Sequence, residues 1–395
     1  MPFSPATFKG VINERGLSND QAASIAGMSL KKLMQTFEGE NTPTKNQILK
    51  LAERLAVPPY AFFVENFKLP PSKIIDFRAS KPVSLQYGKD SSKFEYLFHL
   101  QDFLSLLYTR LDLDAPDKIY SAEADENPEQ FAKSVEGLIG LKEIRESAQD
   151  KNDFYRKFRK SIESLGVYVI QDHNISLGID GFALYHENFT SNMIFVNSGN
   201  RNAAAKCFTL AHELSHIFGK RSAISNNYEY DNEVEAYANE FAASLIIPRE
   251  DLLEEIGNGR YSFADYDFSK RSAIKLSEIF KCSVSAMMVR LSRLGFVKGS
   301  YTSQFLSGFS KKNFPDAEKP QSYGPKTGPK PGVIDLAHLG ARATMVLVLA
   351  LEKGVTSKYE IFENTGLSKK RIEGLVEVCA AKKIYEEHKI DGINT

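Results

Sequence analysis

Two histidines and a glutamate lie close together in the stretch "FTLAHELSHIFG", residues 208–219. His212 and His216 are four positions apart, so on a helix both imidazoles project from one face at neighbouring turns. Zinc binds imidazole nitrogens, and a catalytic zinc takes three protein ligands and leaves one position open. Glu213 is rotated about 100° from His212 around such a helix, which puts it outside the ligand set but within reach of a reacting water. The spacing therefore predicts a metal site with a general base beside it.

The alternative is an ordinary amphipathic helix that carries polar residues on its surface. The flanking residues argue against this, because the positions around the histidines are apolar: Leu210, Ala211, Leu214, Ile217 and Phe218. A helix with such flanks is mostly buried, and buried polar side chains need partners. A bound metal ion would give both imidazoles that partner.

The third ligand is expected on a second helix, within "DNEVEAYANEFAASLIIP", residues 231–248. On spacing alone Glu233, Glu235 and Glu240 are all candidates. The apolar side of this helix places Glu235 and Asn239 together along its edge, one turn apart, while the other two carboxylates fall more toward solvent. We therefore expect Glu235 to be the third ligand and Asn239 to hydrogen-bond a ligating histidine.

Taken together, "FTLAHELSHIF" and "EAYANEFAASLIIP" resemble the ImmA/IrrE family of zinc metallopeptidases. The family pairs an AHELxH helix with an ExxAN/DxFAxxLLxP helix. The resemblance implies that His212, His216 and Glu235 bind Zn²⁺, that Glu213 is the catalytic base, and that the family's Asn or Asp falls at Asn239. It covers about residues 160–295, including "FKCSVSAMMVRLSRLG". Ser215 replaces a common Gly and "LIIP" replaces "LLMP", but neither change touches a proposed ligand.

The elements that must position this site are a short sheet and two long helices. Short β-branched runs predict strands around 166–171 and 193–197, and helical patterns cover roughly 202–218 and 231–247. The strand that ends in "IFVN", 194–197, resembles one that the family places just before the metal helix. We expect it to pass near the cleft, where it could bind an extended peptide by strand addition.

Residues 1–57 predict a small all-helical unit. Ser18 and Ser29 are expected N-caps, and Gly27 lies between the two helices that they begin, which is the helix-turn-helix pattern. Many members of the resembled family carry such a phage-repressor-type module. The expected DNA contacts are polar residues on the second of these helices: Ser29, Lys31, Lys32, Gln35 and Thr36.

The charge of this segment leaves a second interpretation open. Residues 1–57 hold seven basic and five acidic side chains, and a net charge of +2 gives only a weak attraction to DNA. A helical module that binds protein, or that has lost its operator, is the alternative. The resemblance favours DNA.

Five segments follow from these patterns. We predict a helix-turn-helix domain over 1–67, a helical connector over 68–150, a metallopeptidase domain over 151–310, a linker over 311–332 and a C-terminal helical domain over 333–395. The linker rests on five Pro and three Gly in residues 315–332. The C-terminal "VTSKYEIFENTGLSKKRIEGL" repeats the pattern of residues 18–37. The basic residues near 369–371 could add a second contact with DNA, but the pattern favours a solvated face. The predicted fold class is mostly α with a small α+β peptidase core.

Composition limits the remaining possibilities. Fifty basic residues balance fifty acidic ones, so the total charge requires no polyanionic partner. Three widely separated cysteines fit free buried thiols in a reducing compartment, and the polar N-terminus and the lack of an 18-residue apolar run favour a cytoplasmic chain without a membrane partner.

The functional hypothesis is a DNA-binding regulator with a zinc endopeptidase that cleaves a repressor-type protein, working as a possible homodimer. The narrow substrate class is implied by the family resemblance. The alternatives are a transcription factor whose zinc pocket is a sensor or structural site without proteolysis, and an antitoxin-like module that binds a protein. Glu213 distinguishes the peptidase from the first alternative, because a sensor has no need of a base beside the metal.

Overall fold

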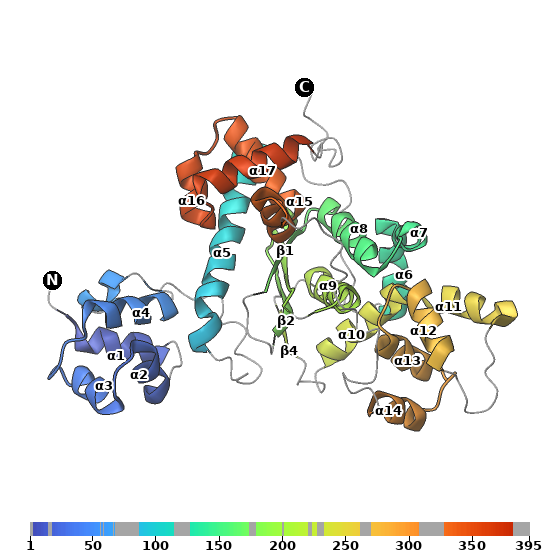
Figure 1. Ribbon diagram of the computed structural model, residues 1–395, viewed down its shortest axis with the longest axis horizontal. Helices are drawn as coiled ribbons and strands as arrows, with labels where there is room; N and C mark the ends of the chain where they lie inside the picture. Colours follow the sequence, from blue (N-terminus) through green and yellow to red (C-terminus); the bar gives the residue numbers. More distant parts are fainter. Residues whose placement is uncertain are drawn as a thin grey trace. The chain divides into compact units, whose positions relative to one another are not determined.

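Figure 1 shows the computed structural model of the chain. The structure describes residues 3–14, 18–55, 57, 59–65, 67, 87–113, 127–173, 179–199, 201–219, 223–226, 233–260, 270–307 and 328–381. Most of the predicted linker, residues 311–327, and the first part of the predicted connector, residues 68–86, lie outside the described residues.

The predicted fold class is confirmed: the described residues are mostly helical, with one small sheet. Internal contacts divide the chain into two units, Met1–Phe103 and Leu104–Thr395. The long helix α5 (Tyr87–Arg110) contributes to both units. The domain boundaries given above stay predictions.

Before α5, the described residues of the first unit form four helices and a short 3₁₀ turn around an apolar core. They are α1 (Pro5–Glu14), α2 (Asn19–Ala26), α3 (Leu30–Phe37), α4 (Lys45–Leu55) and η1 (Pro59–Phe63). The predicted caps are confirmed. Ser18 closes a capping box with Gln21, Ser29 accepts from the Lys32 amide, and Gly27 ends α2 at φ +65°. Phe8 of α1, Leu33 of α3 and Leu51 of α4 are fully buried in one apolar cluster of this unit.

The second unit contains the sheet and the remaining helices. In chain order these are α6 (Pro128–Ile139), α7 (Leu141–Ser147), α8 (Lys151–Ser164), β1 (Tyr168–Asp172), β2 (Ile179–Leu184), η3 (Phe189–Ser191), β3 (Met193–Asn197), α9 (Ala203–Phe218), β4 (Ala223–Asn226), α10 (Glu233–Ile246), α11 (Arg249–Glu255), the π-helical η4 (Ile256–Arg260), α12 (Lys270–Ile279), α13 (Val284–Arg293), α14 (Gly299–Ser307), α15 (Pro331–Glu352), α16 (Lys358–Thr365) and α17 (Lys369–Ala381). The two predicted strands and the two predicted helices of the metal site are confirmed to within a few residues.

The sheet has the order β1-β3-β2-β4. β1 and β3 are parallel, and β2 runs antiparallel to both β3 and β4. All five residues of β3 are buried, as expected for a central strand that packs on both faces. The sequence analysis placed β3 where a peptide could be added, and this is wrong: β1 and β2 already occupy both of its hydrogen-bonding edges. In the described part of the chain the edge strand on that side is β4.

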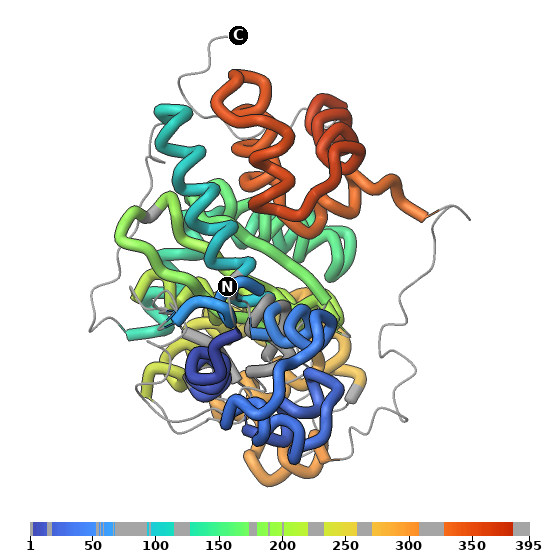
Figure 2. Tube along the Cα trace, turned by 90° about the vertical axis from the view of Figure 1, so that its left-hand side faces the viewer, coloured from blue at the N-terminus to red at the C-terminus, as the bar shows by residue number. Residues whose placement is uncertain are grey.

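The C-terminal helix α15 packs against strand β1 of the sheet. α15 contacts β1, α8 and α17, and the orange-red and red helices of residues 331–381 lie together at the top of Figure 2. By length and composition α15 could cross a membrane, but 67% of the relevant window is buried, which is typical of a core helix. A kink at Gly340, with φ +81°, brings its backbone against Glu163 and Arg159 of α8. The α15 backbone can approach so closely only because Gly340 has no side chain.

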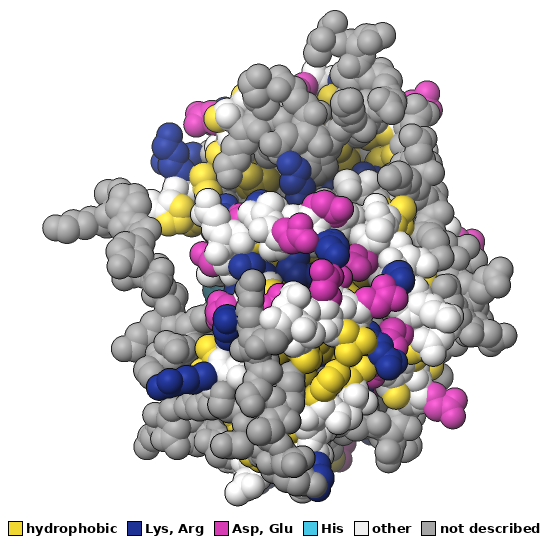
Figure 3. Space-filling model, turned by 90° about the vertical axis from the view of Figure 1, so that its right-hand side faces the viewer, with side chains coloured by type: hydrophobic (Ala, Val, Ile, Leu, Met, Phe, Trp, Pro, Cys, Tyr) yellow, Lys and Arg dark blue, Asp and Glu magenta, His cyan; other side chains and the backbone are white. Residues whose placement is uncertain are grey.

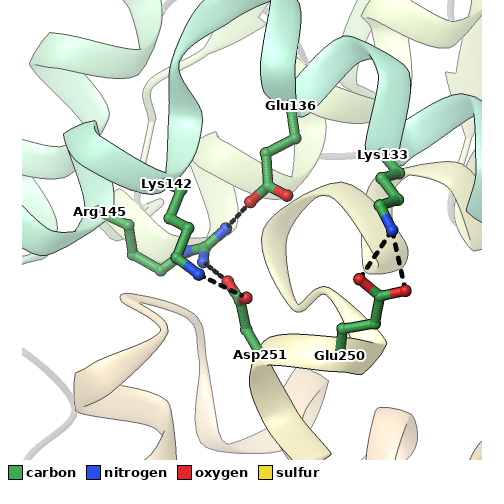
Figure 4. A network of polar contacts seen from close by, with 6 residues as sticks. All are labelled: Lys133, Glu136, Lys142, Arg145, Glu250 and Asp251. Atoms are coloured by element: carbon green, nitrogen blue, oxygen red, sulfur yellow. Dashed lines mark hydrogen bonds and ion pairs between the residues drawn. The ribbon is translucent and has the colours of Figure 1, made fainter. Parts of the chain in front are cut away.

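A polar network fastens α11 to α6 and α7 (Figure 4). Arg145, only 5% exposed, bonds Glu136 at 2.6 Å and Asp251 at 2.7 Å, so its buried charge is compensated from two helices. The outer contacts of the network are Lys133 with Glu250 and Lys142 with Asp251. Elsewhere on the face shown in Figure 3, basic and acidic side chains are intermixed. Among the described residues on this face, the charges of both signs therefore alternate.

Candidate metal centre

Helix α9 carries both predicted histidines and the predicted base. It begins at Asn202, whose side-chain oxygen accepts from the Ala205 amide at 2.8 Å, and it packs between the sheet and helices α8 and α10. This position buries the polar residues: His212 is 6% exposed, His216 2% and Glu213 0%. These polar residues are buried because the apolar residues around them on α9 are part of the hydrophobic core.

Helix α10 brings the carboxylate to the histidines. Phe131 of α6 packs its ring against Phe218 of α9 and Phe241 of α10, with centroids 5.5 and 5.0 Å away. Arg290 of α13 fixes the far side of α10, bonding Glu240 at 2.7 Å and the Ile247 carbonyl at 3.2 Å. The two helices that carry the site are therefore clamped by aromatic packing and by a buried ion pair.

The three predicted ligands converge on one point. Glu235 Oε2 lies 3.1 Å from His212 Nε2, and Glu235 Oε1 lies 3.4 Å from His216 Nε2. The two Nε2 atoms are 3.2 Å apart. In a tetrahedral shell with metal–ligand bonds of about 2.05 Å, neighbouring ligand atoms are about 3.3 Å apart. The observed separations match that value, so the donor set fits a zinc-sized ion.

Asn239 lies where the sequence placed it, with Oδ1 3.1 Å from His212 Nδ1. An acceptor at Nδ1 holds the proton on that nitrogen and leaves Nε2 free to bind a metal. Burial raises the pKa of the Glu235 carboxyl, but hydrogen bonds from His212 and His216 outweigh it and hold this pKa at about 2. Burial likewise opposes the charged form of His212, yet the contacts with Glu235 and the charge of Glu213 raise its pKa. The site therefore concentrates negative charge where a cation would bind.

The two other carboxylates of α10 stand apart from the cluster. Glu233 is exposed, as predicted. The Glu240 side chain is 28% exposed, against 20% for Glu235, and Arg290 and Arg293 both bond it. Among the described residues, His212, His216 and Glu235 form the one group of His, Cys, Asp and Glu side chains whose geometry could hold a metal ion.

Gly181 of β2 is a residue of the site that the sequence analysis missed. A Cβ atom there would lie 2.5 Å from Thr209 Cγ2, 2.8 Å from the Phe195 carbonyl oxygen and 3.2 Å from Glu213 Oε1. The carboxylate of Glu213 therefore rests against bare backbone. A lone glycine inside a strand pattern was the available signal, because it marks a close approach of the backbone.

The comparison with known families agrees with this geometry. Residues 162–292 match the family model Peptidase_M78, described as an IrrE N-terminal-like domain. We call residues 162–292 the M78 segment. It makes up about a third of the chain and contains all four residues of the centre. The match indicates a metallopeptidase-type function, and peptidases of this family are typically metal-dependent. No curated protein matches the chain.

The predicted DNA contacts lie outside the M78 segment, on α3. Ser29 and Lys31 are exposed, and Lys32 and Gln35 are half-buried. Thr36 was also predicted to contact DNA, and this is wrong: it is fully buried and its hydroxyl bonds the Lys32 carbonyl at 2.9 Å. A side chain so enclosed cannot reach a groove.

Proposed function

We propose that the chain is a zinc-dependent endopeptidase of the HExxH plus Glu type, with His212, His216 and Glu235 as ligands. The observation that carries the proposal is the convergence of two imidazoles and one carboxylate: the two Nε2 atoms are 3.2 Å apart, and each lies 3.1 or 3.4 Å from one oxygen of Glu235. Two imidazoles and one carboxylate are a donor set that catalytic zinc uses. A zinc ion held there would polarise a peptide carbonyl and lower the pKa of water.

The chain's own residues supply the remaining steps. Glu213 follows His212 on α9, and its buried carboxylate accepts a proton from the attacking water and passes it to the leaving amine. Asn239 orients the His212 ring through Nδ1. Gly181 keeps the backbone of β2 close to Glu213, which limits the space available to that carboxylate.

The sheet provides a place for an extended substrate. Ser225 of β4 pairs with Gly181, the residue that lies against Glu213. A peptide added along the outer edge of β4 would therefore run level with the base, and strand addition would recognise its backbone rather than a particular sequence. A repressor-type protein is our proposed substrate, by similarity to the family.

We also propose that the N-terminal unit binds DNA through Ser29, Lys31, Lys32 and Gln35, in a cytoplasmic protein that acts as a homodimer. A protein-binding role for the same helix is the second candidate. It is favoured by Leu30 and Met34, which are 42% and 40% exposed on one side of α3. The test is Lys31→Ala in a chain that also carries Lys369→Ala and Lys370→Ala: loss of DNA binding would support the first candidate, and unchanged binding would support the second.

Substitution of the base tests the enzymatic proposal. Glu213→Gln keeps the size of the side chain but removes its basicity, and loss of a general base slows such reactions on the order of 10²–10⁴-fold. We expect the variant to bind zinc normally and to fail to cleave a co-expressed repressor encoded beside this chain. Glu233→Gln is the matched control, since that carboxylate is exposed on the neighbouring helix. If Glu213→Gln cleaves as fast as the wild type, the mechanism is wrong.

A further inference from the structure

Residues 357–376 repeat the helix-turn-helix geometry of residues 18–37. Ser18 and Ser357 stand at the start of each copy in extended conformation, and each side chain accepts from the amide three residues further on, at 3.2 and 3.1 Å. Each first helix, α2 and α16, is eight residues long. The copies therefore begin in the same way.

The turns are also equivalent. Gly27 and Gly366 end the first helices in the left-handed region, with φ +65° and +67°. Two residues later a serine begins the second helix in both copies: the Ser29 carbonyl accepts from the Leu33 amide and the Ser368 carbonyl from the Ile372 amide, each at 3.0 Å. Glycine is needed at this position because other residues rarely adopt the left-handed conformation.

Burial follows the same pattern through both second helices. Over the twelve residues that start at Ala26 and at Thr365, the classes of burial agree at every position except the one held by Met28 and Leu367. In α17 the buried positions include Ile372, Leu375 and Cys379, which pack with α15. The burial classes agree at eleven of the twelve positions, and these include the residues of the turn. The amphipathicity of helices alone does not explain agreement in the turn.

The exposed residues of the two copies differ in charge. α3 begins with Ser29, Leu30 and Lys31, whereas the equivalent positions of α17 are Ser368, Lys369 and Lys370, and all six residues are exposed. The next basic residue, Arg371, is held by Asp335 of α15 through bonds of 3.0 and 3.1 Å from Nε. The start of α17 therefore presents one more cation than the start of α3.

An acidic side chain on the same helix, Glu373, is compensated. Glu373 lies one turn after Lys369 on α17, and Lys358 of α16 bonds it at 2.8 Å. That ion pair also lowers the pKa of Glu373. Its negative charge is therefore balanced within the same pair of helices, and Lys369 and Lys370 keep their attraction for an anion.

We propose that α16 and α17 form a second helix-turn-helix, which binds duplex DNA. In this arrangement α17 is the helix that enters the major groove, and Ser368, Lys369 and Lys370 at its start contact phosphates and base edges. α15 supplies a third helix, against which α17 packs (Figures 1 and 2). The proposal does not depend on the metal centre or on DNA binding by the N-terminal unit.

The test is the salt dependence of DNA binding by the full chain. We expect the wild type to bind a labelled 30-base-pair duplex of arbitrary sequence in fluorescence anisotropy. Each lost phosphate contact lowers the slope of log K against log salt by about 1, so Lys369→Ala with Lys370→Ala should lower it by about 2. The control removes two other exposed cations of the same unit, Arg249→Ala with Lys353→Ala, and should keep the wild-type slope.

Two results would overturn the proposal. One is a wild-type chain that does not bind the duplex at low salt. The other is a slope in the α17 variant that equals the slope of its control, even if Lys31→Ala in the N-terminal unit reduces binding. Thermal unfolding of each variant shows that its fold is intact, and cleavage by the peptidase should be unchanged in all of them.

Discussion

The contact between Gly181 and Glu213 allows a prediction whose size follows from the structure. In Gly181→Ala the new methyl group meets Thr209 Cγ2 at 2.5 Å and the Phe195 carbonyl oxygen at 2.8 Å, both too close for carbon. The φ of Gly181 lies outside the left-handed region, so the effect is one of space and not of backbone strain. The carbonyl belongs to the central strand β3 and cannot yield, so β2 and α9 must move apart.

Overpacking of this kind costs about 1–3 kcal/mol. For a unit of this size the loss corresponds to a decrease in Tm of roughly 2–12 °C. Separation of β2 from α9 also displaces Glu213, and a misplacement of about 1 Å can reduce kcat/KM on the order of 10²-fold. We therefore expect the variant to lose far more activity than its loss of stability at the assay temperature explains.

Two variants serve as controls in unfolding and cleavage assays. Gly137→Ala lies on an exposed turn of α6 with nothing within 4 Å, and should be neutral or stabilising by up to about 1 kcal/mol. Thr209→Ser added to Gly181→Ala removes the closest contact and should restore part of both stability and activity. If the Tm and kcat/KM of Gly181→Ala equal those of the wild type, Gly181 does not pack closely against Thr209 and Phe195.

Three further predictions concern the framework around the site. Arg290→Met removes the bonds to Glu240 and Glu129 and should lower the free energy of unfolding by about 3 kcal/mol. This is the low end for a buried ion pair, because both carboxylates reach solvent. An unchanged urea denaturation curve would contradict this prediction. Gly340→Ala forces φ +81° on an L-residue and drives a methyl group into the Glu163 carboxylate, so we expect a loss of about 2–5 kcal/mol, and a Tm equal to that of the wild type would refute it. Burial raises the pKa of Glu163 from its usual 4.5 to about 7 against the opposing charge of Arg159. Between pH 4.5 and 7 the folded chain therefore holds a proton on Glu163 that the unfolded chain has lost. The contribution of this proton to the free energy of unfolding is full below pH 4.5 and is lost as the pH rises through 7, by at most about 3 kcal/mol. Glu163→Gln should remove that pH dependence of unfolding.

Much of the metal centre could be predicted from the sequence because it depends on local periodicity. The spacing of His212 and His216 fixes their common face, and the pairing of Glu235 with Asn239 selects one carboxylate of three. The helix caps at Ser18 and Ser29 are local too, and both are present in the structure. In each of these features the partner lies within a few residues or on a second helix with a strong apolar pattern.

The features that were missed depend on contacts between distant segments. The order of the strands decides whether β3 is central or at an edge, and no period within β3 reveals it. Glu240 is bonded by Arg290, fifty residues away. Thr36 is a more local case: the loop after α3 folds back, so that Asn41, five residues further on, bonds the Thr36 hydroxyl at 2.9 Å, and the helical pattern of α3 does not show this. Residues of this kind are placed by tertiary packing, which sequence patterns do not contain.

The metal content of the purified protein tests the central claim most directly. Elemental analysis of the wild type should find one zinc per chain, and His212→Ala should lose it, while Glu233→Ala, which changes an exposed neighbour of the site, should keep it. A wild type that neither contains nor takes up zinc, or a His212→Ala variant that retains a full equivalent, would contradict the account.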